Sequence, residues 1–237
     1  MSVIKVFNLN IWNYTNWEER RPKILNSIKK QDPDIITLQE VRDDIKFNKR
    51  GDNQAKQLNR ILKYPYYAFY PVTAKHKEKP EKYGDYCIEG TAVLSKFPIL
   101  KAKNITLRKH KDDRHKCGNL HVTIKADKLI ELIVVHFSNN NYFSLLHLLE
   151  TLKYVKEKRI SPIILGDFNI IDNYIMHELI EDDYESSLLF KKYLSYPPAN
   201  YTLDYILIPK TYRFRSLNCL KENISDHLAL VAEIETN

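Results

Sequence analysis

The sequence predicts an α/β fold of the α+β kind, in which two packed sheets carry helices on their outer faces. Three observations lead to this prediction. Apolar runs typical of strands outnumber segments with helical spacing, helices separate the early strands, and polar clusters recur where strands end. No repeat, low-complexity tract or linker-like stretch divides the chain, so we expect residues 1–237 to form one domain with a well-buried core.

The beginning of the chain alternates strand and helix. Residues 3–11 alternate as a strand does, and residues 18–31 place apolar side chains at the spacing of an amphipathic helix. Pro33 ends that helix and leads into a strand at 35–38, because the residue before a proline is disfavoured in helical conformation. Residues 52–63 carry their apolar side chains on one helical face, which predicts a second helix.

The middle of the chain shows several strand patterns and one long helical pattern. An aromatic run at 66–71 is strand-like, and residues 91–94, 120–124 and 132–136 have the length and apolar character of further strands. Residues 142–158 repeat apolar side chains at helical spacing. We therefore expect a long helix to follow this group of strands.

The last third of the chain supplies the remaining predicted strands. Residues 162–165 form a short, fully apolar run, and residues 203–208 and 228–234 are strand-like. Polar residues lie at the ends of these runs. Because a rigid strand can hold a side chain in place, we expect the chemistry of the protein to collect there.

The composition is that of an ordinary globular protein, with 43% apolar residues and 11% aromatic residues. With 5 glycines and neither a GxGxxG nor a GxxxxGK[ST] motif, a glycine-rich phosphate loop is not expected. We see no signal peptide and no apolar run of membrane-spanning length, so we expect no stable membrane association. The cysteines form no CxxC and leave an odd thiol, which favours a reduced, cytoplasmic setting; they are Cys87, Cys117 and Cys219.

The net charge of +7 favours polyanionic partners such as nucleic acid, anionic membrane or phosphorylated small molecules. Two stretches, 73–86 and 108–116, concentrate basic side chains with tyrosines in the first of them. They are either solvated loops or a rim that grips phosphates and stacks bases. From these stretches we predict the following substrate-binding residues: Lys75, Lys77, Tyr86, Arg108 and Arg114.

Three polar clusters follow or precede apolar strands. Glu40 comes after a buried strand, where a carboxylate needs a partner or a metal. Asp167 and Asn169 lie two apart in an extended segment and so face the same side, although an Asx turn would use the same residues. Asp226 and His227 precede the last strand; as neighbours they point different ways, so one can hold a metal while the other meets the nucleophile.

Two further residues complete the candidate set. His136 ends an apolar strand and could donate to a phosphate oxygen, although a core histidine is an equally good explanation. Asp204 is a carboxylate within a strand, and such a group usually pairs with a cation or a histidine. Carboxylates, amides and imidazoles in this combination predict a site that cleaves phosphoesters with a hard metal ion.

In the order and type of its motifs, the chain resembles the endonuclease/exonuclease/phosphatase superfamily, the group that includes DNase I. The resemblance runs from the first strand to the last. It rests on Asn10 within Asn-Leu-Asn-Ile-Trp, Gln39-Glu40-Val41, the run from Glu89-Gly90-Thr91 to Pro98-Ile99, His136, Gly166-Asp167-Phe168-Asn169, Leu203-Asp204-Tyr205-Ile206 and Ser225-Asp226-His227.

The resemblance implies a four-layer α/β/β/α sandwich with the site at one edge of the paired sheets. It implies that Glu40 is the main metal carboxylate, helped by Asn10 and Asp226. Mg²⁺ is the expected cofactor, with Mn²⁺ able to substitute, because Mg²⁺ prefers a few protein oxygens together with waters and substrate phosphate. A monomer is the family-like expectation.

The resemblance also implies the catalytic roles. His227 would be the general acid/base, oriented by Asp204, and His136 would contact the scissile phosphate, oriented by Glu89. The attacking water, the phosphate or a second ion would be held by Asp167 and Asn169. The expected reaction is metal-assisted attack of water on phosphorus, without a covalent enzyme intermediate.

Some residues of this chain differ from those typical of individual branches of the superfamily, and these differences narrow the range of expected substrates. Val41 stands where the abasic-site endonucleases have threonine, and His136 where they usually have tyrosine. The run from Gln39 to Asp43 resembles DNase I, so Arg42 could reach a groove, yet the secretory signal and disulfide loop of DNase I are missing. Glu89-Gly90 and Ser225-Asp226-His227 also resemble tyrosyl-DNA phosphodiesterases and bacterial sphingomyelinases.

We therefore expect a Mg²⁺-dependent phosphodiesterase that acts on nucleic acid, as a nuclease or a DNA-end-processing enzyme. The alternatives are a phospholipid or small-phosphoester hydrolase of the same fold, and a catalytically silent binding module. The basic stretches favour nucleic acid.

Overall fold

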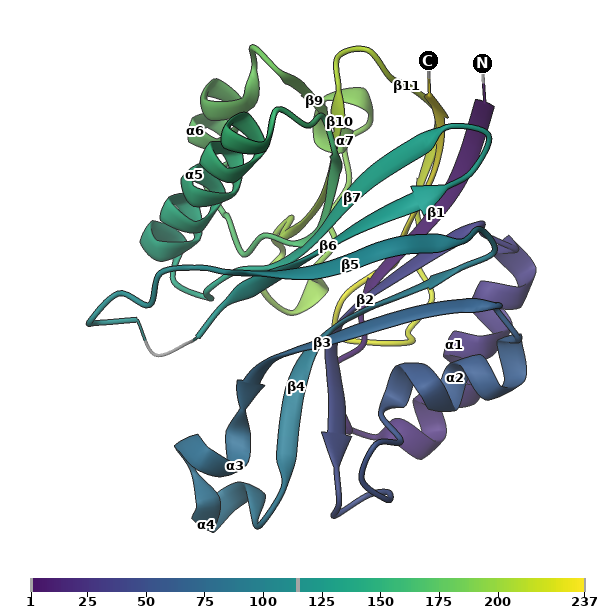
Figure 1. Ribbon diagram of the computed structural model, residues 1–237, viewed down its shortest axis with the longest axis vertical. Helices are drawn as coiled ribbons and strands as arrows, with labels where there is room; N and C mark the ends of the chain where they lie inside the picture. The colour runs from purple at the N-terminus through teal and green to yellow at the C-terminus, as the bar shows by residue number, and fades with distance from the viewer. Residues whose placement is uncertain (1, 114–115, 237) are drawn as a thin grey trace.

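Two six-stranded mixed sheets pack face to face and carry helices on their outer sides (Figure 1). The computed structural model describes residues 2–113 and 116–236. The first sheet has the order β11-β12-β1-β2-β4-β3, and the second has the order β5-β6-β7-β8-β10-β9. This arrangement confirms the predicted pair of sheets with outer helices.

The strands of the first sheet are β1 (Ser2–Asn10), β2 (Ile35–Asp44), β3 (Tyr66–Ala74), β4 (Cys87–Ser95), β11 (Arg213–Cys219) and β12 (Leu230–Thr236). Those of the second are β5 (Ile99–Thr106), β6 (Gly118–Lys125), β7 (Leu129–His136), β8 (Ile163–Asp167), β9 (Tyr184–Ser186) and β10 (Asp204–Pro209). Each predicted strand is present, and β5, β9 and β11 are additional.

The helices are α1 (Trp17–Gln31), α2 (Gln54–Leu62), α3 (Lys75–Glu78), α4 (Pro80–Tyr83), α5 (Asn141–Lys158), α6 (Asn173–Ile180) and α7 (Ser187–Phe190), with a 3₁₀ turn at Pro197–Ala199. Helices α1 and α2 cover the first sheet, and α5 and α6 cover the second (Figure 1). The stretch predicted as a basic loop at 73–86 instead ends β3 and forms the short helices α3 and α4. No helix among the described residues is long and apolar enough to cross a membrane.

The two parallel strand pairs explain where the long helices go. Strand β1 pairs in parallel with β2, and β7 pairs in parallel with β8. A parallel pair needs a crossover connection, and α1 and α5 supply these connections. Helix α5 is capped by Asn140, whose side chain accepts hydrogen bonds from the backbone N–H groups of Tyr142 and Phe143.

Three apolar layers follow from the two-residue period of the strands. In β1, Ile4 and Val6 face the second sheet, whereas Phe7 and Leu9 face α1 and α2. The same alternation in β8 sends Leu165 between the sheets and Ile164 toward α5. The inter-sheet layer therefore receives every second residue of each central strand.

Candidate active site

The inter-sheet layer becomes polar at the strand ends farthest from the chain termini. Ser2 pairs with Thr236 at one end of β1, and β1 stops at Asn10 at the other end. The residues that continue the inward-facing rows of their strands at that second end are polar: Asn10, Glu89, Thr91, His136, Asp167 and Asp204. The same two-residue alternation that places apolar side chains in the core therefore places these polar side chains in the site.

Glu40 reaches this site through a break in its strand. In an unbroken β2 it would follow Ile36 and Leu38, which face α1 and α2. The pairing of β2 with β4 instead shifts register between Leu38 and Val41, and Glu40 has a left-handed backbone with φ 55°. Such a conformation costs about 1–2 kcal/mol in a residue other than glycine. The bulge turns the carboxylate toward the inter-sheet cavity.

Two asparagines hold the Glu40 carboxylate. Asn10 Nδ2 donates to Glu40 Oε1 at 3.3 Å and to Asp167 Oδ2 at 3.0 Å, and Asn13 Nδ2 donates to Glu40 Oε2 at 2.8 Å. The backbone N–H of Trp12 donates to Asn10 Oδ1 at 3.0 Å, which fixes the orientation of that amide. Asn10 therefore presents its nitrogen, rather than the oxygen predicted to hold a metal, to the two carboxylates.

A buried carboxylate–imidazole pair lies beside them. Asp204 Oδ2 accepts a hydrogen bond from His227 Nδ1 at 2.8 Å, and both residues are at least 95% buried. This bond leaves Nε2 of His227 facing Asp167 Oδ2 at 3.8 Å. Burial alone would lower the pKa of His227, but the carboxylates around it, first Asp204 and then Asp167, raise that pKa to about 10.

Asp167 is the point on which two imidazoles converge. Besides His227, the ring of His136 approaches the same oxygen, with His136 Nε2 3.6 Å from Asp167 Oδ2. Burial, together with the charge of Asp204, raises the pKa of Asp167 to about 6 against the lowering effect of the two histidines. Asn169 donates its backbone N–H to Asp167 Oδ1 at 3.0 Å and has a left-handed backbone, φ 53°. A water or phosphate oxygen beside Asp167 would therefore lie close both to imidazole donors and to a carboxylate acceptor.

Glu89 has different partners from the one predicted. It was expected to orient His136, but no hydrogen bond between these two is found among the described residues. Its carboxylate is held by Arg42, with Nε 2.5 Å from Oε2, and by Lys75, with Nζ 3.2 Å from Oε1. Burial would raise the pKa of Glu89, but the charges of Arg42, Lys75 and His136 lower it below its usual value. Both oxygens of the carboxylate are thus ion-paired with Arg42 and Lys75, and His136 acts on it through its charge.

The donor set suits a hard cation. Glu40 and Asp226 line the same cavity, and burial and the charge of Glu40 both raise the pKa of Asp226 despite the opposing effect of His227. Two carboxylates that repel each other in a partly buried space are stabilised by a cation between them. Oxygen ligands of this kind fit Mg²⁺ or Mn²⁺ better than thiophilic ions.

A cavity of about 460 Å³ lies at this end of the two sheets, and the site residues that line it are Glu40, Glu89, His136, Asp167, Asn169, Asp226 and His227. Of the predicted substrate-binding residues, Arg42 and Lys75 line it, and Lys116 adds a further cation. Three others are absent from the described lining residues: Lys77, Tyr86 and Arg108. Arg114 lies outside the described residues.

The predictions above missed several residues that shape the site. Tyr196 lines the cavity, and its ring packs on that of His227 with centroids 4.8 Å apart. Arg20, in α1, is 5% exposed and donates to backbone carbonyls on both sides of the site: Ile11, Trp12, Asn13, Thr15 and Ile224. No sequence signal distinguishes this arginine from its half-buried neighbour Arg21. Asn13 could have been suspected because it follows the Asn-Leu-Asn-Ile-Trp motif.

Comparison with known proteins identifies a family and a shared fold. The sequence profile of the endonuclease/exonuclease/phosphatase family matches residues 8–227. The catalytic domain of human Nocturnin with bound sulfate has a similar structure, with a TM-score of 0.76 and 23% identity, covering 99% of this chain and 95% of that one. No curated protein sequence matches the chain significantly.

Two further solved structures have the same fold. A family member from Beutenbergia cavernae superposes with a TM-score of 0.79 at 18% identity, covering 100% of this chain and 72% of that one. D. rerio TDP2 in complex with a single-strand DNA product superposes with a TM-score of 0.74 at 14% identity, covering 100% of each chain. At these identities the likeness establishes the four-layer fold.

Proposed function

This chain belongs to the endonuclease/exonuclease/phosphatase family, and on that premise we propose that it is a Mg²⁺-dependent phosphodiesterase that hydrolyses nucleic acid. The observation that carries the proposal is the convergence of two imidazoles on one carboxylate oxygen. His136 Nε2 and His227 Nε2 lie 3.6 and 3.8 Å from Asp167 Oδ2, in the cavity that also holds Glu40. Displacement at phosphorus needs both kinds of group, proton carriers and oxygen ligands for a cation, in one cavity.

Each residue then has a definable part in the reaction. Asp167 and Asn169 position the attacking water, whose oxygen forms the new bond to phosphorus while its proton passes to the pair of Asp167 and His227. His136 donates to a non-bridging phosphate oxygen, and the bond to the leaving oxygen breaks on the opposite side from the water. The leaving oxygen keeps the bonding electron pair and takes up a proton from His227 or from solvent. A cation held by Glu40 and Asp226 would neutralise phosphate charge when bound.

Asp204 prepares His227 for this task. Its carboxylate fixes the proton on Nδ1 and turns Nε2 toward the cavity, where the proton of the water or of the leaving group is exchanged. Because its pKa is raised, the His227 ring is protonated when no cation is bound. A cation nearby would lower that pKa to a value near pH 7, at which the ring can both accept and donate a proton.

Charge supports nucleic acid as the substrate. The net charge is +7, and Arg42, Lys75 and Lys116 lie on the cavity that contains the catalytic groups. Phosphate contacts by such side chains supply most of the affinity for a nucleic-acid backbone. TDP2, which shares the fold, has been seen with a single-strand DNA product.

A small phosphoester is the second candidate, and the size of the cavity favours it. About 460 Å³ is within the range of pockets that bury a single small ligand. Nocturnin, of the same fold, holds a sulfate anion. In either case, the cleaved bond is a phosphoester.

The decisive test is Mg²⁺-dependent hydrolysis of a panel, with EDTA controls. The panel contains plasmid DNA, single-stranded DNA, RNA, a 5′-tyrosyl oligonucleotide, a dinucleotide and sphingomyelin. Cleavage of a nucleic-acid member is expected, and His227→Ala should reduce it about 10²- to 10⁴-fold while the fold is retained. Cleavage of the dinucleotide alone would support the small-phosphoester function, cleavage of sphingomyelin alone would indicate a lipid substrate, and no cleavage would indicate a binding module.

Salt dependence separates a polyanion from a small ligand. Binding of single-stranded DNA should weaken steeply as salt rises, and Lys116→Gln should reduce the slope by about 0.7 if that side chain contacts one phosphate. Lys153→Gln, an exposed lysine on α5 that is 76% exposed, is the matched control and should leave the slope unchanged. Equal slopes for all three proteins would argue against Lys116 as a phosphate contact.

A further inference from the structure

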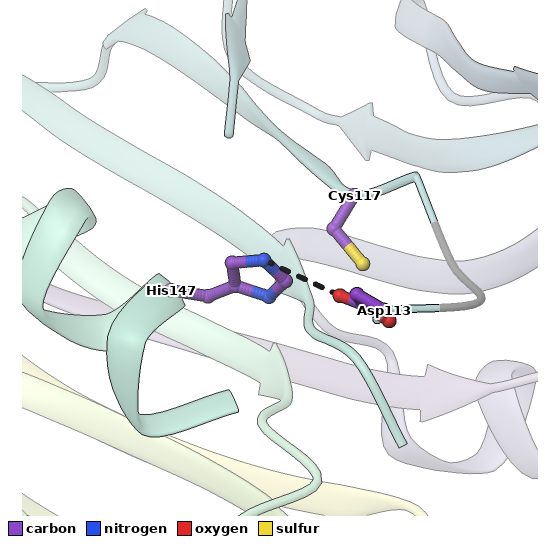
Figure 2. A group of neighbouring side chains, drawn as sticks. All are labelled: Asp113, Cys117 and His147. Atoms are coloured by element: carbon purple, nitrogen blue, oxygen red, sulfur yellow. Dashed lines mark ion pairs between the residues drawn. The ribbon is translucent and has the colours of Figure 1, made fainter. Parts of the chain in front are cut away.

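A second cluster of ligand-type side chains lies beside the active site. Asp113, Cys117 and His147 are 4%, 6% and 0% exposed, and each offers one ligand atom within 4.8 Å of the others (Figure 2). Asp113 and Cys117 come from the segment that precedes β6, and His147 comes from the first half of α5. Figure 2 shows the thiol, the carboxylate and the imidazole turned toward a common point.

The distances in this cluster fit a shared ion better than a hydrogen bond. His147 Nε2 and Asp113 Oδ2 are 3.8 Å apart, which is beyond hydrogen-bonding distance. Two ligand atoms about 2.1 Å from a tetrahedral ion lie about 3.4 Å from each other. The pair of His147 and Asp113 would therefore have to contract by about 0.4 Å, and the pairs with Cys117, which lie within 4.8 Å, by at most about 1.4 Å. Nε2 of His147 is buried and forms no hydrogen bond of regular geometry with any described residue, although the backbone of Arg108 interacts with the ring.

Ser138 holds one member of the cluster, Asp113, in its orientation. Its hydroxyl donates to Asp113 Oδ1 at 2.8 Å, which fixes the carboxylate with Oδ2 toward His147. Hydrogen bonds to the ligands of a metal orient them in this way in many sites. The backbone N–H of Ser138 also approaches His147 Nδ1 at 3.3 Å. This long contact would have to give way on binding, because an imidazole that ligates through Nε2 carries its proton on Nδ1.

We propose that Asp113, Cys117 and His147 form a second cation site, selective for a thiophilic divalent ion of the Zn²⁺ class. Sulfur and nitrogen ligands favour Zn²⁺ over Mg²⁺, whereas the all-oxygen set around Glu40 has the opposite preference. Cys117 binds as a thiolate and releases its proton to solvent. Three protein ligands leave a fourth position for water.

The position of this site gives the ion a structural task. It would tie the segment before β6 to α5, which already packs on the second sheet through Leu148, Leu152 and Val155. Ser138 lies two residues after His136, and Cys117 itself lines the catalytic cavity. An ion here would therefore stiffen one wall of that cavity without replacing the cation at Glu40.

The test is metal binding by the full chain, read without any activity. Protein freed of metal with EDTA is titrated with Zn²⁺ and, separately, with Co²⁺ in the presence of excess Mg²⁺. The wild type should bind one equivalent of Zn²⁺, and Co²⁺ should produce the near-ultraviolet charge-transfer absorption of a thiolate ligand. Cys117→Ser should lose that absorption and weaken Zn²⁺ binding by about 100-fold or more, since even a supporting residue is worth about 10- to 100-fold.

Two matched variants locate the ion. Cys219→Ser removes a half-buried thiol elsewhere, and Glu40→Gln removes the carboxylate of the Mg²⁺ site; both should still bind Zn²⁺ and show the absorption. Absence of the thiolate absorption in wild-type protein would overturn the proposal whatever the stability of the variants. Its persistence in Cys117→Ser, or its loss in Cys219→Ser, would do the same. None of these outcomes depends on the proposed hydrolytic function.

Discussion

Asp204 and His227 form a buried pair in which the carboxylate accepts the Nδ1 proton of the imidazole at 2.8 Å. The two residues are 23 positions apart in the chain, on β10 and in the segment before β12. The pair joins the two sheets, because β10 belongs to the second and β12 to the first. The contact therefore depends on how the sheets pack, and the chemistry of His227 depends on the contact.

Replacing Asp204 with Asn should separate the orienting role of this carboxylate from its bulk. An amide can bond His227 in the wrong tautomer, so we expect turnover to fall by about 10³- to 10⁴-fold with little change in fold. The pKa of His227 should fall as well, because a charge that raises it is gone. Steady-state kinetics and an NMR titration of the imidazole measure both. Activity within tenfold of the wild type would contradict the orienting role.

The stability of the metal-free protein should depend on pH through His227. Its pKa in the folded state is raised above the ordinary 6.5 to about 10, so the folded state holds the proton more tightly. The contribution to the free energy of unfolding is complete below pH 6.5 and is lost as pH rises to about 10. The loss is at most about 5 kcal/mol, because the pKa rises from 6.5 to about 10 and each pKa unit is worth about 1.4 kcal/mol.

Urea denaturation in EDTA at intervals from pH 7 to pH 10 measures this loss. His227→Gln is the control, because it cannot titrate and the other groups that change charge in this range remain. The difference in stability between wild type and variant should shrink as pH rises. A constant difference would show that His227 does not bind its proton as tightly as its carboxylate neighbours imply.

Glu40→Gln should raise the Mg²⁺ concentration needed for half-maximal activity by at least about tenfold and lower turnover at saturation. The variant keeps the size of the side chain and removes the charge that, with Asp226, would hold the cation. It also keeps an oxygen to accept from Asn13. A Mg²⁺ titration of activity, with circular dichroism to verify the fold, checks this. An unchanged half-maximal concentration would place the cation elsewhere.

Arg20→Met should lower the free energy of unfolding by about 3 kcal/mol, since it leaves several buried carbonyls without a charged donor. Because Arg20 binds the backbone at both Asn13 and Ile224, the variant should also raise the Mg²⁺ requirement. Arg20→Lys should rescue little, because an ammonium cannot reproduce the fork of the guanidinium. Arg21→Met, on the exposed side of α1, is the matched control for urea denaturation. Equal stability of the two Met variants would contradict this stabilising role of Arg20.

Gly90→Ala should destabilise the protein by more than about 2 kcal/mol through a clash. A Cβ at this position would lie 1.9 Å from the carbonyl oxygen of Tyr70 and 2.8 Å from Cα of Pro71, on the neighbouring strand β3. Gly51 has no atom within 4 Å of such a Cβ but has φ +86°. Gly51→Ala should therefore cost only about 1 kcal/mol of backbone strain. Thermal denaturation of both variants distinguishes the two causes.

Much of the fold and part of the site could be predicted because they follow from the periodicity of apolar side chains along the sequence. The alternation along β1, β7, β8 and β10 decides which side chains face inward. Asn10, His136, Asp167 and Asp204 continue those inward rows. The short strand β9 and the one-turn helices were missed because a few residues carry too little periodicity. The strand β5 lies at the edge of its sheet and alternates weakly, since much of it is exposed.

The partners of Glu89 and the cluster at Cys117 could not be predicted. Glu89 meets Arg42 because β2 and β4 are antiparallel neighbours, and it meets Lys75 because β3 runs beside β4 and ends there. His147 meets Asp113 because α5 covers the second sheet next to the segment before β6. Charge complementarity selects such partners only among the side chains that the packing has already brought near.

The sequence by itself determined the two-sheet architecture, the family and the residue types at the ends of the strands. Only the tertiary structure decided where those residues point and what they touch. Glu40 is the clearest case, since strand period alone would turn it toward the helices, and a bulge with a left-handed residue turns it into the cavity. Local sequence sets the period of a strand, but the free energy that maintains such a break comes from contacts made by Asn10 and Asn13 across the fold.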